Sequence, residues 1–186
     1  DLPECYAKAG FCIYFVQRIW AVKQADILIS GGGMVGLSLA LALSQGGLKV
    51  VVVDVVPPAA VLEPKFDGRV SALAYASVRM LTALGAWEGL KPHAQPIHEI
   101  LVTDGQAGKP ASPFSLHFDA QEVGAASLGH IAENRFIRAA LHEAVAKQAN
   151  LELIAPASVK SLTVESGRAV ARLASGDEIS AALVIA

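Results

Sequence analysis

Residues 27–40, ILISGGGMVGLSLA, place three glycines between an apolar, β-type run and a run of helix-forming residues. Residues 26–30 (DILIS) have the composition of a strand, and residues 34–47 predict a helix that stops at two glycines. Residues 48–54 (LKVVVVD) form a continuous valine run, which is typical of a strand buried on both faces of a parallel sheet. The order strand, helix, strand predicts a right-handed βαβ unit.

The glycines at 31, 33 and 36 have the spacing G-x-G-x-x-G at the junction between the first strand and the helix. In that context Gly31 allows a tight turn, Gly33 lets a diphosphate approach the backbone, and Gly36 allows close packing of helix on strand. The amides at the helix start, including those of Met34 and Val35, have no partner inside the helix, and the helix dipole favours an anion there. We therefore predict a Rossmann-like dinucleotide-binding loop. The alternative is a glycine turn that binds no ligand.

Asp54 ends the valine strand and lies 23 residues after Gly31. A carboxylate about 20 residues after the first glycine is placed to bind the ribose hydroxyls of an adenine nucleotide. Its alternative role is to initiate a turn before the prolines that follow. Strand, glycines, helix, strand and acid together are a much more specific signal than the glycines alone.

The remainder of the chain favours FAD over NAD. A simple NAD domain continues with another helix and parallel strand soon after its second strand, whereas here residues 55–66 predict a proline-rich loop or extended connection. A β-hairpin is then inserted before the next strong amphipathic helix. The remaining predicted elements are helices at 76–90 and 133–150 and strands at 97–104, 114–120, 151–155, 158–166, 169–175 and 178–186.

Composition excludes several classes of function. The 186 residues have a formal net charge of −2 and no cluster of Lys or Arg, which argues against nucleic-acid binding. Cys5 and Cys12 have no partner at metal-ligand spacing, so we predict neither a metal site nor a disulfide framework, and a reducing compartment fits. The five histidines, at 93, 98, 117, 130 and 142, form no pair at ligand spacing, and none is assigned to catalysis.

The two ends of the chain carry separate expectations. Residues 1–24 have too short an apolar run for a membrane span and lack the order of a signal peptide, so we expect an appended or mis-started segment outside the fold. Residues 178–186 finish on an apolar strand, which leads us to expect a chain truncated at its C-terminus.

Three segments together resemble one family: residues 27–54, residues 67–90 (DGRVSALAYASVRMLTALGAWEGL) and residues 128–141 (LGHIAENRFIRAAL). They resemble the FAD-dependent aromatic hydroxylases of ubiquinone biosynthesis, which are class A flavoprotein monooxygenases similar to p-hydroxybenzoate hydroxylase. The middle segment, Asp-x-Arg-x-x-Ala-Leu followed by Leu-Gly-x-Trp, is the specific part. The resemblance implies an α/β fold in which residues 25–186 form an incomplete FAD-binding domain, with residues 95–125 as part of an inserted β-rich substrate domain.

The resemblance also implies residue roles on the cofactor side. Gly31, Gly33 and Gly36, with the amides of Met34 and Val35, would lie at the FAD diphosphate, and Asp54 at the adenosine ribose, where the family more often has Glu. Arg69 matches an arginine near the diphosphate and ribityl chain, its alternative being an ion pair with Asp67. Asn134 matches a polar position near the ribityl chain, its alternative being a helix N-cap. Arg135 is ambiguous in the same way.

The reaction implied is hydroxylation of a prenylated phenol with NAD(P)H and O₂ through a flavin hydroperoxide, the protein placing the ring and excluding water. The resemblance also suggests a cytoplasmic enzyme with peripheral contact to the inner membrane and to other quinone-biosynthesis enzymes. The fragment alone is expected to be inactive, because the family's later FAD-contacting segments do not occur in it. Two alternatives stay open: an FAD oxidoreductase that transfers no oxygen, such as a prenyl reductase, and an inactive nucleotide-binding remnant.

Overall fold

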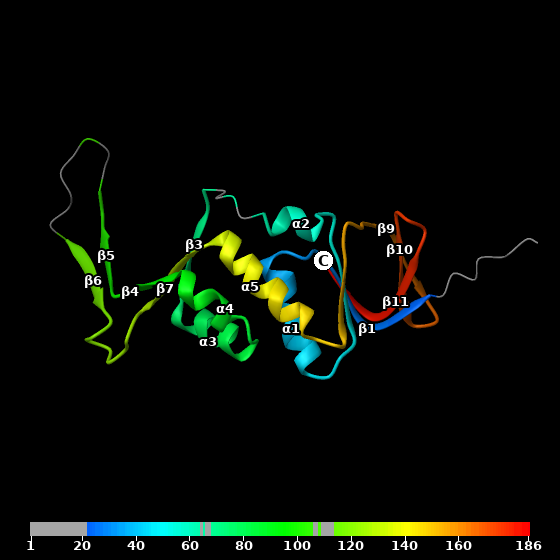
Figure 1. Cartoon of the computed structure of the whole chain (residues 1–186), viewed down its shortest axis with the longest axis horizontal. Helices are drawn as coiled ribbons and strands as arrows, with labels where there is room; N and C mark the ends of the chain where they lie inside the picture. Colours follow the sequence, from blue (N-terminus) through cyan, green and yellow to red (C-terminus); the bar gives the residue numbers. More distant parts are fainter. Residues whose placement is uncertain (1–21, 64, 66–67, 106–107, 109–113) are drawn as a thin grey trace, which may run out of the picture.

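A twisted sheet occupies one end of the molecule, helices fill the middle, and a β-hairpin projects from the other end (Figure 1). The computed structural model describes residues 22–63, 65, 68–105, 108 and 114–186. The helices are α1 (Met34–Gln45), α2 (Pro58–Val61), α3 (Tyr75–Ala83), α4 (Trp87–Leu90) and α5 (Asn134–Ala146), with a 3-10 turn η1 (Lys91–His93). The strands are β1 (Lys23–Ser30), β2 (Val50–Val53), β3 (Val70–Ala74), β4 (Ala94–Ile97), β5 (Glu99–Thr103), β6 (Ser115–Asp119), β7 (Gly129–Glu133), β8 (Leu151–Ile154), β9 (Val159–Glu165), β10 (Arg168–Leu173) and β11 (Glu178–Ile185).

The main sheet has six strands in the order β8-β2-β1-β11-β10-β9. Neighbours among β8, β2, β1 and β11 pair in parallel, and α1 connects β1 to β2, so the predicted βαβ unit is confirmed. The last strands differ from a wholly parallel sheet, because β10 is antiparallel to both β9 and β11. For β9 and β10 the reason is local: Ser166 and Gly167, with φ of +49° and +77°, form a two-residue connection that allows only an antiparallel return. The connection from β10 to β11 is also a short turn, closed by the Leu173 amide donating to the Asp177 carbonyl oxygen at 2.8 Å.

The valine strand β2 is buried on both faces, as its composition predicts. Val50 and Val52 pack in the cluster formed with α1 and α5, while Val51 and Val53 pack on the opposite face with residues of β10 and β11. All four side chains are at most 2% exposed. Burial at this level makes β2 a rigid support for the residue that follows it, Asp54.

Two predicted elements differ from the structure. The helix expected over residues 76–90 is two helices, because Gly85 has a φ of +76° and ends α3 before α4 begins. The connection expected to be irregular over residues 55–66 contains the short helix α2, which starts at Pro58, the helical position that proline favours. The strand β1 begins at Lys23, two residues before the expected domain boundary, because Lys23 already pairs with Ile179.

A second sheet, β3-β7-β4, was not predicted. This sheet places β3, which follows Gly68, beside the start of α5. The reason is that β3 pairs antiparallel with β7, and β7 leads directly into α5. Its strands are short and rich in small residues, so they carry little alternating pattern. Gly129 is required there, because a Cβ at that position would lie 2.3 Å from the carbonyl oxygen of Leu73.

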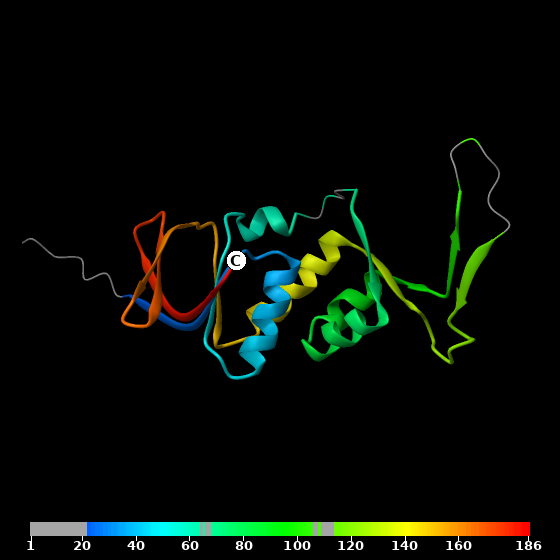
Figure 2. The ribbon, with the colours of Figure 1, turned by 180° about the vertical axis from the view of Figure 1, so that it is seen from behind.

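The hairpin β5-β6 confirms the expected pair of strands and projects away from the helices (Figures 1 and 2). Its side chains are largely exposed, including Leu101, Leu116 and Phe118. The assignment of residues 95–125 to a separate substrate domain stays a prediction.

Candidate functional site

The glycine loop between β1 and α1 is held in a conformation that needs glycine at two positions. Gly31 has a φ of +124°, which side-chain-bearing residues rarely adopt, and its amide donates to the carbonyl oxygen of Val53 at 2.8 Å. A Cβ on Gly36 would lie 2.0 Å from the carbonyl oxygen of Gly31. The first turn of α1 therefore packs directly against the end of β1, as the sequence spacing indicates.

The start of α1 is open to a ligand. Gly33 is the N-cap residue, no side chain caps the helix, and the first amide with an intrahelical acceptor is that of Leu37, at 2.9 Å from the Gly33 carbonyl oxygen. A Cβ built on Gly33 has nothing within 4 Å among the described residues, and Val35 is 83% exposed. The amides of the first turn therefore face open space with a positive helix end behind them, which suits a diphosphate.

Asp54 faces this loop. Its Oδ2 accepts a hydrogen bond from the Gly32 amide at 2.5 Å, and its Oδ1 accepts one from the Val56 amide at 2.6 Å. Each carboxylate oxygen has a second lone pair, so the group retains the capacity to accept from a ribose hydroxyl. The carboxylate thus ties the glycine loop to the end of β2. The Asp54 side chain also explains Gly32, because a Cβ there would lie 3.0 Å from the Asp54 Cβ.

Gly32 is a site residue that the motif spacing does not identify, since it occupies a variable position between two required glycines. The signal available in the sequence is the unbroken run of three glycines. In the structure its amide is the link between loop and acid.

Asn134 lies at the first helical position of α5 and is 9% exposed. The expected alternative, a helix N-cap, is wrong, because Glu133 is the N-cap residue. Instead the Asn134 Oδ1 accepts a hydrogen bond from the Ser71 hydroxyl at 2.7 Å, and the Asn134 amide donates to the Arg69 carbonyl oxygen at 3.1 Å. The Arg69 side chain is exposed, and its expected ion-pair alternative, Asp67, lies outside the described residues.

The Arg135 side chain contacts neighbouring side chains of the protein. Its Nε lies 2.7 Å from Glu133 Oε2, and its guanidinium lies 4.6 Å from the centre of the Phe136 ring. His93 stacks on Phe136 at 3.9 Å between ring centres. These contacts connect the start of α5 to η1, and no cofactor role is needed to explain Arg135.

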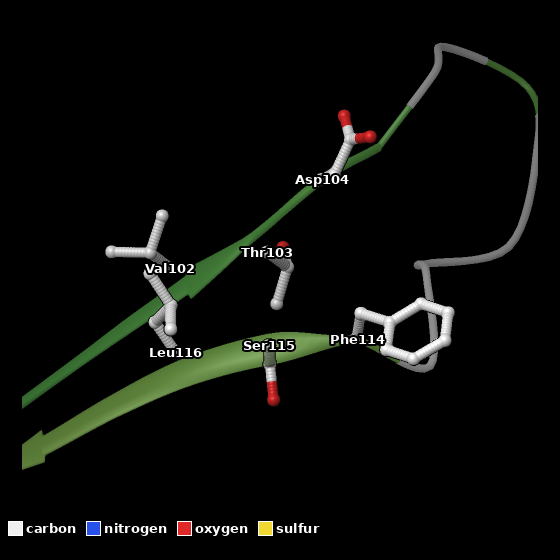
Figure 3. A pocket seen from close by; sticks show the side chains of 6 residues that line it. All are labelled: Val102, Thr103, Asp104, Phe114, Ser115 and Leu116. Carbon is white, nitrogen blue, oxygen red and sulfur yellow. The ribbon is translucent and has the colours of Figure 1, made fainter.

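A largely apolar cavity of about 430 Å³ lies next to the first turn of α1. It is lined from α1, β3, α3 and α5, by Met34, Val35, Ser38, Leu39, Ala42, Ser71, Leu73, Ser77, Met80, Leu81, Ile137 and Leu141. The structure thus brings Met34 and Val35 into one cavity with Ser71, the partner of Asn134. A larger pocket of about 630 Å³ lies on the projecting hairpin, between Val102, Phe114 and Leu116, and is formed by none of the predicted site residues (Figure 3).

The pKa values of two histidines, His130 and His142, are lowered. Burial lowers the pKa of His142, and the nearby Asp54 carboxylate partly opposes that effect. Burial, followed by the positive charges of His98 and Lys91, lowers the pKa of His130. In the part of the chain that the structure describes, His142 Nε2 and His130 Nδ1 are buried without a hydrogen-bond partner.

Two kinds of feature are absent from the described residues. No helix among them is both long enough and apolar enough to cross a bilayer. Within the same residues, no three or more His, Cys, Asp or Glu side chains gather in an arrangement that could hold a metal ion.

Comparison with known proteins agrees with this geometry. Residues 24–182 match the family described as FAD binding domain. The chain is 39% identical over 165 residues to ubiquinone hydroxylase UbiL of Rhodospirillum rubrum, covering 89% of this chain and 37% of the relative. It is 33% identical over 165 residues to the 3-demethoxyubiquinol 3-hydroxylase of Escherichia coli, covering 88% of this chain and 41% of that enzyme. The family resemblance read from the sequence is confirmed.

Solved structures show the same fold at lower identity. PqsL of Pseudomonas aeruginosa, described as a probable FAD-dependent monooxygenase, superimposes with a TM-score of 0.67 at 21% identity, covering 87% of this chain and 42% of its own. The p-nitrophenol 4-monooxygenase PnpA of Pseudomonas putida superimposes with a TM-score of 0.66 at 16% identity, covering 88% of this chain and 40% of its own. The chain spans about two fifths of the length of these relatives.

Proposed function

Because this chain belongs to the FAD binding domain family, we propose that it is the N-terminal part of an FAD-dependent monooxygenase that hydroxylates a prenylated phenol in ubiquinone biosynthesis. The observation that carries the cofactor assignment is the open start of α1 beside the Gly32–Asp54 hydrogen bond. The relatives named ubiquinone hydroxylases support the substrate class.

The residues of this chain fit the adenosine diphosphate half of FAD. The space in front of Gly33 and the amides of Met34, Val35 and Gly36 suit the diphosphate oxygens, and Asp54 suits the ribose hydroxyls. Arg69 would add a planar, two-pronged donor for diphosphate oxygens, a role in which lysine does not replace arginine.

When bound, the flavin supplies the redox chemistry that activates O₂ at the expense of NAD(P)H. The overall reaction consumes one phenol, one O₂, one NAD(P)H and one proton, and yields the hydroxylated phenol, water and NAD(P)⁺. The part played by this chain is to bind and orient the cofactor. A prenyl tail partitions into a bilayer, so we also propose a cytoplasmic protein that meets the membrane surface peripherally, close to other quinone-biosynthesis enzymes.

The test uses the complete polypeptide that the gene encodes, purified and reconstituted with FAD. We expect a yellow protein whose oxidation of NAD(P)H is stimulated by a prenylated phenol, with one atom of ¹⁸O₂ appearing in the product. A flavoprotein that oxidises NAD(P)H without placing ¹⁸O in the product would be a reductase instead. A protein that retains no FAD would contradict the proposal.

A further inference from the structure

Asn134 is held to Arg69 and to β3 through two different groups, one from its backbone and one from its side chain. Its backbone amide donates to the Arg69 carbonyl oxygen at 3.1 Å, and its Oδ1 accepts from the Ser71 hydroxyl at 2.7 Å. Figure 1 shows β3 and the start of α5 meeting at this point. The two contacts are independent, because one fixes the helix start and the other fixes the carboxamide.

The Ser71 contact determines which way the carboxamide faces. A carboxamide has an acceptor oxygen on one side and a two-donor nitrogen on the other. With the oxygen turned to Ser71, the Nδ2 hydrogens point to the opposite side of the group. A fixed orientation removes the need to order the group when a ligand arrives.

One of the two residues, Ser71, belongs to the cavity next to the first turn of α1. Ser71 lines that cavity together with Met34 and Val35 of α1. Ile137 and Leu141 line it from α5, and Asn134 lies three residues before Ile137, on the same helix face. The carboxamide therefore sits at the end of this face that lies nearest to β3.

We infer that Ser71 is a positioning residue for the cofactor, holding the Asn134 carboxamide so that its Nδ2 donates to an oxygen on the ribityl side of FAD. The inference rests on the proposed FAD function and assigns to Ser71 a role that the motif positions do not give it. A purely structural alternative is that the Ser71–Asn134 hydrogen bond only joins β3 to α5. The two differ in one respect: a structural link would affect every ligand alike, whereas a positioned carboxamide affects only ligands that carry the ribityl chain.

The experiment is a calorimetric titration of the 186-residue chain and three variants with FAD and, separately, with ADP, which contains no ribityl chain. For Ser71→Ala we expect about 3- to 10-fold weaker FAD binding, as for one lost neutral hydrogen bond, with ADP binding unchanged. Ser71→Thr retains the hydroxyl and should restore FAD binding. Thr82→Ala removes a hydroxyl from α3 outside the cavity and should bind both ligands like the wild type.

The outcomes separate this inference from the function on which it rests. Equal losses for FAD and ADP in Ser71→Ala would show a structural link and overturn the positioning role, as would wild-type FAD binding in that variant or weak FAD binding in Ser71→Thr. In each of those cases the FAD site itself stands. A wild-type chain that binds neither FAD nor ADP would overturn the proposed function, and the inference with it.

Discussion

Replacing Gly36 with alanine tests the close contact between α1 and the end of β1. A Cβ there would lie 2.0 Å from the Gly31 carbonyl oxygen and 3.1 Å from its carbonyl carbon. Side-chain carbons do not approach backbone atoms closer than about 3 Å, so the helix start must move by roughly 1 Å. Because the obstacle is backbone, we expect the upper end of the overpacking range, about 3 kcal/mol. For a chain of 186 residues this corresponds to a melting temperature lower by about 6–12 °C.

The matched control is Gly33→Ala, three residues earlier in the same loop. Gly33 has a φ of −73°, which alanine adopts freely, and a Cβ there has nothing within 4 Å among the described residues. We expect this variant to melt like the wild type but to bind FAD at least tenfold more weakly, because the added methyl group occupies the space proposed for the diphosphate. Thermal unfolding by circular dichroism and FAD titration measure the two effects. A Gly36→Ala protein with wild-type melting, or a Gly33→Ala protein with wild-type affinity, would refute the reasoning.

Three further predictions concern charged and titratable groups. Asp54→Asn should lower the free energy of unfolding by about 1–3 kcal/mol and should also weaken FAD binding. The reason is that the new amide nitrogen would face one of the two backbone donors that now bind the carboxylate, the amides of Gly32 and Val56. Denaturant unfolding and FAD titration measure the two effects, and unchanged values would contradict the prediction. Arg69→Lys should weaken FAD binding about 3- to 10-fold despite its retained charge, since the two-pronged donor is lost; an affinity equal to wild type in calorimetry would argue against a diphosphate contact. Burial lowers the pKa of His142 in the folded protein, so the unfolded chain binds a proton more readily. The contribution of His142 to stability is therefore full above about pH 6.5 and declines as the pH falls towards the folded pKa. His142→Gln should flatten that decline in unfolding free energies measured from pH 7 to pH 5, and an unchanged slope would contradict the assignment.

The parts of this molecule that sequence reasoning predicts are those set by local pattern. The βαβ unit follows from the valine run and the helix between glycines, and the position of Asp54 follows because it directly succeeds a buried strand. The hairpin connection between β9 and β10 was likewise visible as a Ser-Gly turn. In each case neighbouring residues carry enough information to specify the backbone.

The parts that were missed depend on contacts between distant residues. The Ser71 hydroxyl meets Asn134 across 63 positions, and neither residue stands out from its neighbours in the sequence. Strands β3 and β7 are short and support each other, so neither has an alternating pattern strong enough to be recognised alone. The sequence pattern places Gly85 inside a helix because a single glycine is tolerated there, whereas its positive φ ends α3.

The most direct test of the central claim, that the loop from Gly31 to Gly36 and Asp54 bind the adenosine diphosphate part of FAD, is competition. The 186-residue chain is loaded with FAD, ADP or FMN is then titrated against it, and the released FAD is separated by ultrafiltration and measured by chromatography. We predict that ADP displaces FAD and that FMN, which lacks the adenosine half, does so at least tenfold less effectively. Displacement by FMN but not by ADP would contradict the account.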